Sequence, residues 1–151
     1  MPVLAAAPRR SLALLSVVLL AVAAAGCMPA DARTFLERTN ALRSSQGVAP
    51  LAEHDALTQK AEAWAQHMAE TGVLAHSKLT KSLEGVPWLA LGENVAMSSP
   101  TADTLSALQD ILAGSSQHRA NLLSEQFTHL GVGVATGRDG RVWVAEVFAR
   151  L

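Results

Sequence analysis

Two histidines and one glutamate are the side chains of this sequence best suited to carry chemistry. They are His76, Glu93 within the apolar run Leu91–Ala96, and His118. Histidine offers a neutral nitrogen ligand or a proton carrier near neutral pH, and glutamate offers an oxygen ligand or a base. Two histidines and a glutamate are enough for a zinc site that keeps one position open.

The spacing of these three residues is loose. His76 lies 17 residues before Glu93, and Glu93 lies 25 residues before His118. No two of them fall within one helical turn, so they do not form the His-Glu-x-x-His motif of zinc proteases. Spacing alone therefore leaves two interpretations open: one shared polar site, or three unrelated polar residues near the ends of loops.

A second carboxylate, Glu146, interrupts the last apolar run and shares a strand face with Val142, Val144 and Phe148. Such a residue either points into a polar pocket or lies on an edge strand or at a sheet end. The pattern alone favours the edge or sheet-end position. The sequence contains no Gly-x-Ser-x-Gly nucleophile motif, so no dedicated nucleophile is indicated.

Apolar periodicity predicts helices followed by a β-hairpin. We expect four helices, with N-caps at Asp31, Asp55, Thr101 and Ser115 or Ser116. A loop is expected over 73–88 and a strand over 91–97, whereas Asp139-Gly140 between two apolar runs predicts a hairpin. These elements must bring His76, Glu93 and His118 together if they are to act as one site.

The N-terminal segment has the composition of an export signal. Arg9 and Arg10 precede the apolar run 11–25, which ends in Ala24-Ala25-Gly26-Cys27. This ending resembles a bacterial lipobox, which implies cleavage before Cys27 and a lipid on its thiol. The alternatives are an ordinary signal peptide or an uncleaved anchor, although 15 apolar residues are few for a spanning helix, which needs about 20.

Composition limits the remaining possibilities. Cys27 is the only cysteine, so no disulfide can form within the chain, and a lipid attachment site would explain an unpaired cysteine. The chain has 13 acidic and 12 basic residues, so it lacks the basic excess expected of a nucleic-acid-binding domain. We expect residues 1–26 to be a lipoprotein signal peptide, 27–32 a lipidated cysteine and tether, and 33–151 one monomeric domain.

The order of short motifs resembles the CAP superfamily of cysteine-rich secretory, antigen 5 and pathogenesis-related 1 proteins, also called SCP domains. The similarity covers roughly residues 33–150 and is strongest with the short bacterial branch, which lacks disulfides. It implies an α+β fold, an α-β-α sandwich with a mainly antiparallel sheet of three to four strands. The motifs that carry it are Phe35-Leu36-x3-Asn40-x2-Arg43, His76-Ser77, Gly92-Glu93-Asn94, Ser115-x2-His118-Arg119-x-Asn121-Leu122-Leu123, Gly131-Val132-Gly133-Val134-Ala135 and Trp143-x3-Val147-Phe148.

The resemblance implies a central cleft with two histidines and two glutamates, able in some members to bind a divalent cation such as zinc. His76, Glu93 and His118 match three of these four residues. The second glutamate is missing, because Ser115 stands at its position. One carboxylate fewer should weaken cation binding unless Glu146 or water takes its place.

Two functions from different classes remain as hypotheses. The preferred one is a binding module: an extracytoplasmic CAP domain, anchored to the bacterial envelope through Cys27, whose cleft takes a lipid or a cell-wall component, with or without a cation. The alternative is a metal-assisted hydrolase with His76 and His118 as ligands and Glu93 as ligand or base. The missing glutamate and the lack of a nucleophile motif favour binding.

Overall fold

The structure is a computed structural model that describes residues 28–151. The predicted signal peptide and the predicted lipidation site, Cys27, therefore lie outside the described residues. Within residues 28–151, every helix is too short or too polar to cross a membrane.

The helices and strands follow the predicted order. A short additional strand, β1, lies between the first two helices. The elements are α1 (Ala30–Ser45), β1 (Ala52–Glu53), α2 (Asp55–Thr71), β2 (Ala90–Ser98), α3 (Thr104–Gly114), α4 (Ser116–Leu122), β3 (His129–Thr136) and β4 (Val142–Arg150).

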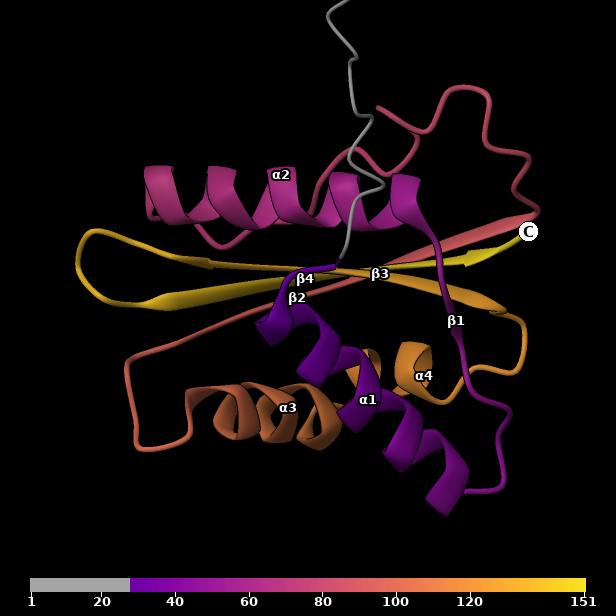
Figure 1. The fold of residues 1–151 in the computed structure, drawn as a ribbon, viewed down its shortest axis with the longest axis horizontal. Helices are drawn as coiled ribbons and strands as arrows, with labels where there is room; N and C mark the ends of the chain where they lie inside the picture. Colours follow the sequence, from indigo (N-terminus) through magenta and orange to yellow (C-terminus); the bar gives the residue numbers. More distant parts are fainter. Residues whose placement is uncertain (1–27) are drawn as a thin grey trace, which may run out of the picture.

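The strands form one sheet in the order β1-β3-β4-β2. β3 and β4 form the predicted antiparallel hairpin, β2 pairs antiparallel with β4, and only β1 runs parallel to its neighbour β3. Helix α2 covers one face of the sheet, and α1, α3 and α4 cover the other (Figure 1). The predicted α-β-α sandwich is confirmed, with a mixed and mainly antiparallel sheet of four strands.

The strand order corrects the favoured position of Glu146. β4 lies between β3 and β2, so it is an inner strand rather than an edge. Glu146 is 0% exposed, and its carboxylate oxygens accept hydrogen bonds from Thr39 Oγ1 and Asn94 Nδ2, both at 3.0 Å. The edge or sheet-end position was wrong because the alternation along one strand does not reveal which strands flank it.

The folded domain begins earlier than the predicted boundary at residue 33. Helix α1 starts at Ala30, and Met28 and Ala32 are buried in the core together with Phe35. From Met28 onward, the segment predicted to be a tether is therefore part of the domain. Its apolar side chains are buried by packing against the sheet rather than left in a spacer.

The predicted N-caps are partly corrected. Asp31 and Asp55 lie in the first turns of α1 and α2 instead of preceding them, where their charge favours the helix N-terminus. Asp103, not Thr101, caps α3 by accepting from Ser106 N. Ser115 caps α4 as predicted, accepting from His118 N at 3.5 Å.

Helix α2 lies unusually close to β3. A Cβ added at Gly131 would lie 2.1 Å from the carbonyl carbon of Leu57, and one at Gly133 would lie 2.2 Å from that of Ala61. Only glycine leaves room for such an approach. The two glycines thus fix the distance between α2 and the sheet, and with it the position of the residues on the outer side of α2.

Candidate functional site

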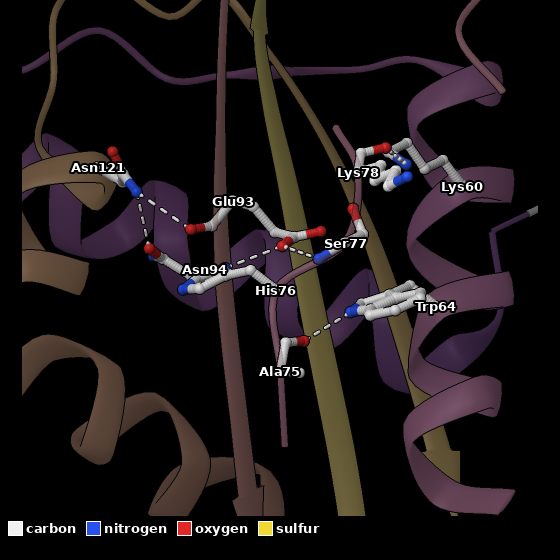
Figure 2. Close-up of polar contacts among 9 residues, drawn as sticks. All are labelled: Lys60, Trp64, Ala75, His76, Ser77, Lys78, Glu93, Asn94 and Asn121. Carbon is white, nitrogen blue, oxygen red and sulfur yellow. Dashed lines mark hydrogen bonds and ion pairs between the residues drawn. The ribbon is translucent and has the colours of Figure 1, made fainter. Parts of the chain in front are cut away.

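Strand β2 brings Glu93 and Asn94 to the edge of the sheet. Successive side chains of a strand point to opposite faces, so Glu93 points toward the α2 side and Asn94 toward the side of the other three helices. Figure 2 shows this divergence, with the Glu93 carboxylate directed at Ser77 and the Asn94 amide near Asn121. Because β2 has a free edge, segments from both faces can meet around it.

Glu93 holds the segment that carries His76. Its Oε2 atom accepts a hydrogen bond from Ser77 N at 2.8 Å and lies 2.9 Å from His76 Nδ1. The Glu93 side chain is only 1% exposed, whereas that of His76 is 60% exposed. The structure thus confirms that His76 and Glu93 meet, with the imidazole at the surface and the carboxylate behind it.

His118 reaches the same edge from helix α4. Its backbone carbonyl accepts a hydrogen bond from Asn94 Nδ2 at 3.2 Å, which ties the helix to β2. Burial lowers the pKa of the His118 imidazole, and the neighbouring His76 lowers it further. His118 is therefore held as a neutral imidazole near neutral pH, close enough to His76 for the two rings to influence each other.

Three buried polar atoms at this edge have no hydrogen-bond partner among the described residues. They are Glu93 Oε1, Ser77 Oγ and His118 Nδ1. Buried polar atoms are nearly always paired with protein, water or a ligand. Each of these atoms therefore needs a partner from outside the described residues, which water or a ligand can supply.

The residues fit a cation only in part. Glu93 Oε1 and His118 Nδ1 are unpaired donor atoms, but His76 Nδ1 is already bonded to Glu93. Within residues 28–151, no group of three or more His, Cys, Asp or Glu side chains is arranged to hold a metal ion. The metal set His76, Glu93 and His118 thus remains a prediction.

No second carboxylate joins the site from the two positions considered. The Ser115 hydroxyl caps α4, and both oxygens of Glu146 are used within the core. Burial raises the pKa of Glu146 to about 7, although hydrogen bonds from Asn94 and Thr39 favour its charged form. Glu146 therefore holds Asn94 in place beneath the site and does not replace the missing glutamate.

Asn94 and Asn121 hold the candidate site in place, and the chemical reasoning from sequence missed both of them. Asn121 Nδ2 donates to Asn94 Oδ1 at 2.9 Å and to the carbonyl of Glu93 at 3.3 Å. Asn94 in turn donates to Glu146 and to the carbonyl of His118. The only signal for these amides was their place in the family motifs, because a neutral amide suggests no chemistry by itself.

Comparison with known proteins places this architecture in a family. The model of the CAP cysteine-rich secretory protein family matches residues 36–147. A protein described as uncharacterized, YkwD of Bacillus subtilis (strain 168), is 29% identical over 126 residues, which cover 78% of this chain and 47% of that protein.

Solved structures agree with this match. An extracellular protein containing an SCP domain from Bacillus anthracis str. Ames is 29% identical, with a TM-score of 0.66 over 80% of this chain and 40% of that one. An outer surface protein from Borrelia burgdorferi shares the fold with a TM-score of 0.71 at 14% identity, over 83% of this chain and 96% of that one.

The two Bacillus proteins are longer than the matched region, and this chain spans less than half the length of each. The family match nevertheless extends from α1 to β4 and includes His76, Glu93 and His118. On the strength of this match and the shared fold, the chain belongs to the CAP family of cysteine-rich secretory proteins.

Proposed function

We propose that this chain is an extracytoplasmic binding module that takes a small polar ligand at the edge of β2, between His76 and His118. The observation that carries the proposal is the set of three unpaired buried atoms: Glu93 Oε1, Ser77 Oγ and His118 Nδ1. Leaving such atoms without partners costs about 1–3 kcal/mol each, so a ligand that pairs with them gains affinity.

The ligand is of the kind that presents hydroxyl or amide groups, as a cell-wall fragment or a lipid headgroup does. The Glu93 carboxylate accepts from such groups at Oε1 while its Oε2 stays bonded to His76 and Ser77. The exposed His76 ring contacts the ligand from the solvent side. Neutral His118 offers one ring nitrogen to pair with the ligand.

Binding is favoured over hydrolysis because the hydroxyl at the site is not activated. A serine nucleophile needs a hydrogen bond to a base, which in turn is oriented by a third group. Ser77 Oγ has no hydrogen-bond partner within the described part of the chain. The His76–Glu93 pair instead holds the backbone of Ser77, which is a positioning role.

A divalent cation such as zinc is a second ligand that we propose to test. Glu93 Oε1 and His118 Nδ1 are donor atoms of the types that zinc prefers. Bound zinc would supply a Lewis acid at the edge of β2.

Zinc should raise the melting temperature of the full-length protein, and His118→Ala should abolish the shift. His67→Ala removes an exposed histidine of α2 and is the matched control. Absence of a shift in the parent protein would rule out the cation.

The ligand is tested by nuclear magnetic resonance of the histidine rings. Muropeptide fragments, or vesicles of bacterial phospholipids, should shift the signals of His76 and His118 in a saturable way. Glu93→Gln should weaken that response by at least about tenfold, the effect of losing one charged hydrogen bond. If neither probe moves the His76 or His118 signals, the binding site is elsewhere.

We further propose that the domain is held at the envelope by a lipid on Cys27. The Bacillus anthracis relative is described as extracellular. Because Met28 is buried in the core, a lipid on the preceding residue would keep the domain directly against the bilayer. The wild-type protein should partition with membranes and Cys27→Ser should not, whereas equal partitioning of both would contradict lipidation.

A further inference from the structure

A cavity lies on the α2 side of the molecule, next to the segment that carries His76. It has a volume of about 350 Å³ and lies between α2 and residues 77–82. Small-molecule pockets measure roughly 300–1,000 Å³, so this cavity suits a small ligand. Figure 2 shows residues of both walls, with Lys60 and Trp64 on α2 facing Ser77 and Lys78.

All the lysines of the chain line this cavity. The sequence contains three lysines, Lys60, Lys78 and Lys81, and each of them contributes to the lining. Among the described residues, no aspartate or glutamate lines it. Because the chain as a whole has more acidic than basic residues, this concentration of positive charge is a local feature. It favours an anionic ligand over a cation or a neutral molecule.

Lys60 is built into the wall rather than lying free on the surface. It is 8% exposed, and its Nζ atom donates to the carbonyls of Lys78 and Lys81, both at 3.0 Å. An ammonium group has three N–H donors, so one has no partner among the described residues. Burial lowers the pKa of Lys60, while the charges of Glu93 and Glu84 raise it.

An aromatic wall lies beside the lysines. The Trp64 ring stacks on His67 with ring centroids 4.7 Å apart, and its indole N–H donates to the carbonyl of Ala75 at 2.8 Å. Both aromatic side chains line the cavity. The hydrogen bond fixes the orientation of the Trp64 ring, so a flat apolar surface is presented next to the ammonium groups.

We propose that this cavity binds a small organic anion: a phosphate or carboxylate group on a flat apolar body. In this arrangement Lys78 and Lys81 bind the anionic group of the ligand, and the third N–H of Lys60 donates to it from the α2 wall. The apolar part of the ligand packs on the Trp64 ring. The inference goes beyond the site at the edge of β2, which it adjoins at Ser77, and it rests on the lysines and Trp64 rather than on that site. The lysines bind there through charge, whereas the β2 site uses His76, Glu93 and His118.

A structural role of the lysines can be separated from ligand binding, because only one of the three lysine side chains makes hydrogen bonds that stabilise the fold. Lys60 secures the turn over 78–81, so replacing it would disturb the fold. The side chains of Lys78 and Lys81 are exposed and make no hydrogen bond within the described residues. Only their backbone serves the turn: both carbonyls accept from Lys60, and Lys81 N donates to the Lys78 carbonyl. Variants at these two positions therefore test the ligand and not the fold.

The test uses the full-length protein and phenyl phosphate. Phenyl phosphate should change the tryptophan fluorescence in a saturable way and protect Lys78 and Lys81 from acetylation, measured by mass spectrometry. The double variant Lys78→Gln/Lys81→Gln should bind at least about tenfold more weakly, a loss of about 1.4 kcal/mol, because both charges that hold the anionic group are removed. Its melting temperature should equal that of the wild type.

The matched control is Arg138→Gln/Arg150→Gln, which removes two exposed positive charges elsewhere. It should keep the affinity of the wild type. The proposal fails if the control loses as much affinity as the lysine variant, or if the lysine variant binds as tightly as the wild type. Equal binding of benzyl alcohol would exclude an anion site, and equal binding of inorganic phosphate would exclude the role of Trp64.

Discussion

The sheet holds two buried glutamates on adjacent strands, and their surroundings differ. Glu93 lies on the edge strand β2, is bonded to an exposed histidine and a backbone N–H, and keeps one oxygen unpaired. Glu146 lies on the inner strand β4, is 0% exposed and is bonded to neutral groups on both oxygens. Under the proposal above, one carboxylate is available to a ligand, whereas the other is enclosed.

The difference shows that strand order, rather than local sequence, assigns the roles of these residues. Each glutamate interrupts an apolar strand, so both look alike along the chain. At the edge of the sheet a loop and a helix can approach β2, and Glu93 gains partners that solvent can reach. In the middle of the sheet, α1 closes over Glu146 through Thr39, and burial raises the pKa of Glu146 to about 7.

Asn94 joins the two carboxylates. Its Nδ2 donates to Glu146 and to the carbonyl of His118, while its Oδ1 accepts from Asn121. Since Asn94 follows Glu93 directly, the buried network around Asn94 fixes the backbone position of Glu93 at the edge of the sheet. Three changes test this comparison.

The largest effect is expected for Asn94→Ala. The substitution leaves one oxygen of Glu146 and an amide proton of Asn121 without partners among the described residues, and it removes the bond that ties the His118 carbonyl to β2. At about 1–3 kcal/mol for each unsatisfied group, partly recovered by water, we expect a loss of roughly 3 kcal/mol or more in the free energy of unfolding. Denaturant unfolding measures it, with the exposed Gln126→Ala as control.

A loss below about 1 kcal/mol for Asn94→Ala would show that the two carboxylates are independent. The same variant should also shift the nuclear magnetic resonance signal of His118. Its backbone carbonyl is then no longer tied to β2.

Glu146→Gln should change the pH dependence of stability. The folded pKa of Glu146, about 7, lies above its ordinary value of 4.5, so between these pH values the folded state binds more protons than the unfolded state. Its contribution to stability is therefore complete below pH 4.5 and is lost as the pH rises toward 7. The loss is on the order of 3 kcal/mol, at about 1.4 kcal/mol per pKa unit.

Glutamine can keep both hydrogen bonds of Glu146 without a charge, because its amide can donate to Thr39 and accept from Asn94. The difference in stability between wild type and Glu146→Gln, measured by denaturant unfolding from pH 4 to 8, should favour the variant increasingly as the pH rises. A difference that stays constant over this range would mean that Glu146 is not protonated in the fold.

The smallest effect is expected for His76→Ala. The side chain of His76 is 60% exposed, and Glu93 Oε2 keeps its bond from Ser77 N when the ring is removed. The net contribution of the lost hydrogen bond is about 0.5–1.5 kcal/mol. Thermal unfolding should therefore show little change, while the proposed ligand binding at the β2 edge is lost. A large destabilisation would show that His76 stabilises the fold. Glu93 would then serve the fold as Glu146 does, and the proposed difference between the two carboxylates would be lost.

Much of the architecture could be predicted from the sequence, because it rests on local patterns. Helical periodicity and the Asp139-Gly140 turn predicted the helices and the hairpin, and the order of motifs predicted the family and its sandwich. The chemistry of His76, Glu93 and His118 selected them as candidates, and the contact between His76 and Glu93 is confirmed. Cap positions were less accurate, since an acidic residue favours the whole first turn of a helix and not the cap alone, as at Asp31 and Asp55.

What only the tertiary structure decided is which residues meet. The inner position of β4 enclosed Glu146, and the free edge of β2 brought His76 to Glu93 across 17 residues of chain. The turn over 78–81 placed two lysines beside Lys60 on α2, although nothing in their spacing indicates a pocket. The physical reason is that periodicity reports which face of an element is buried, whereas contacts between elements depend on how the whole chain packs.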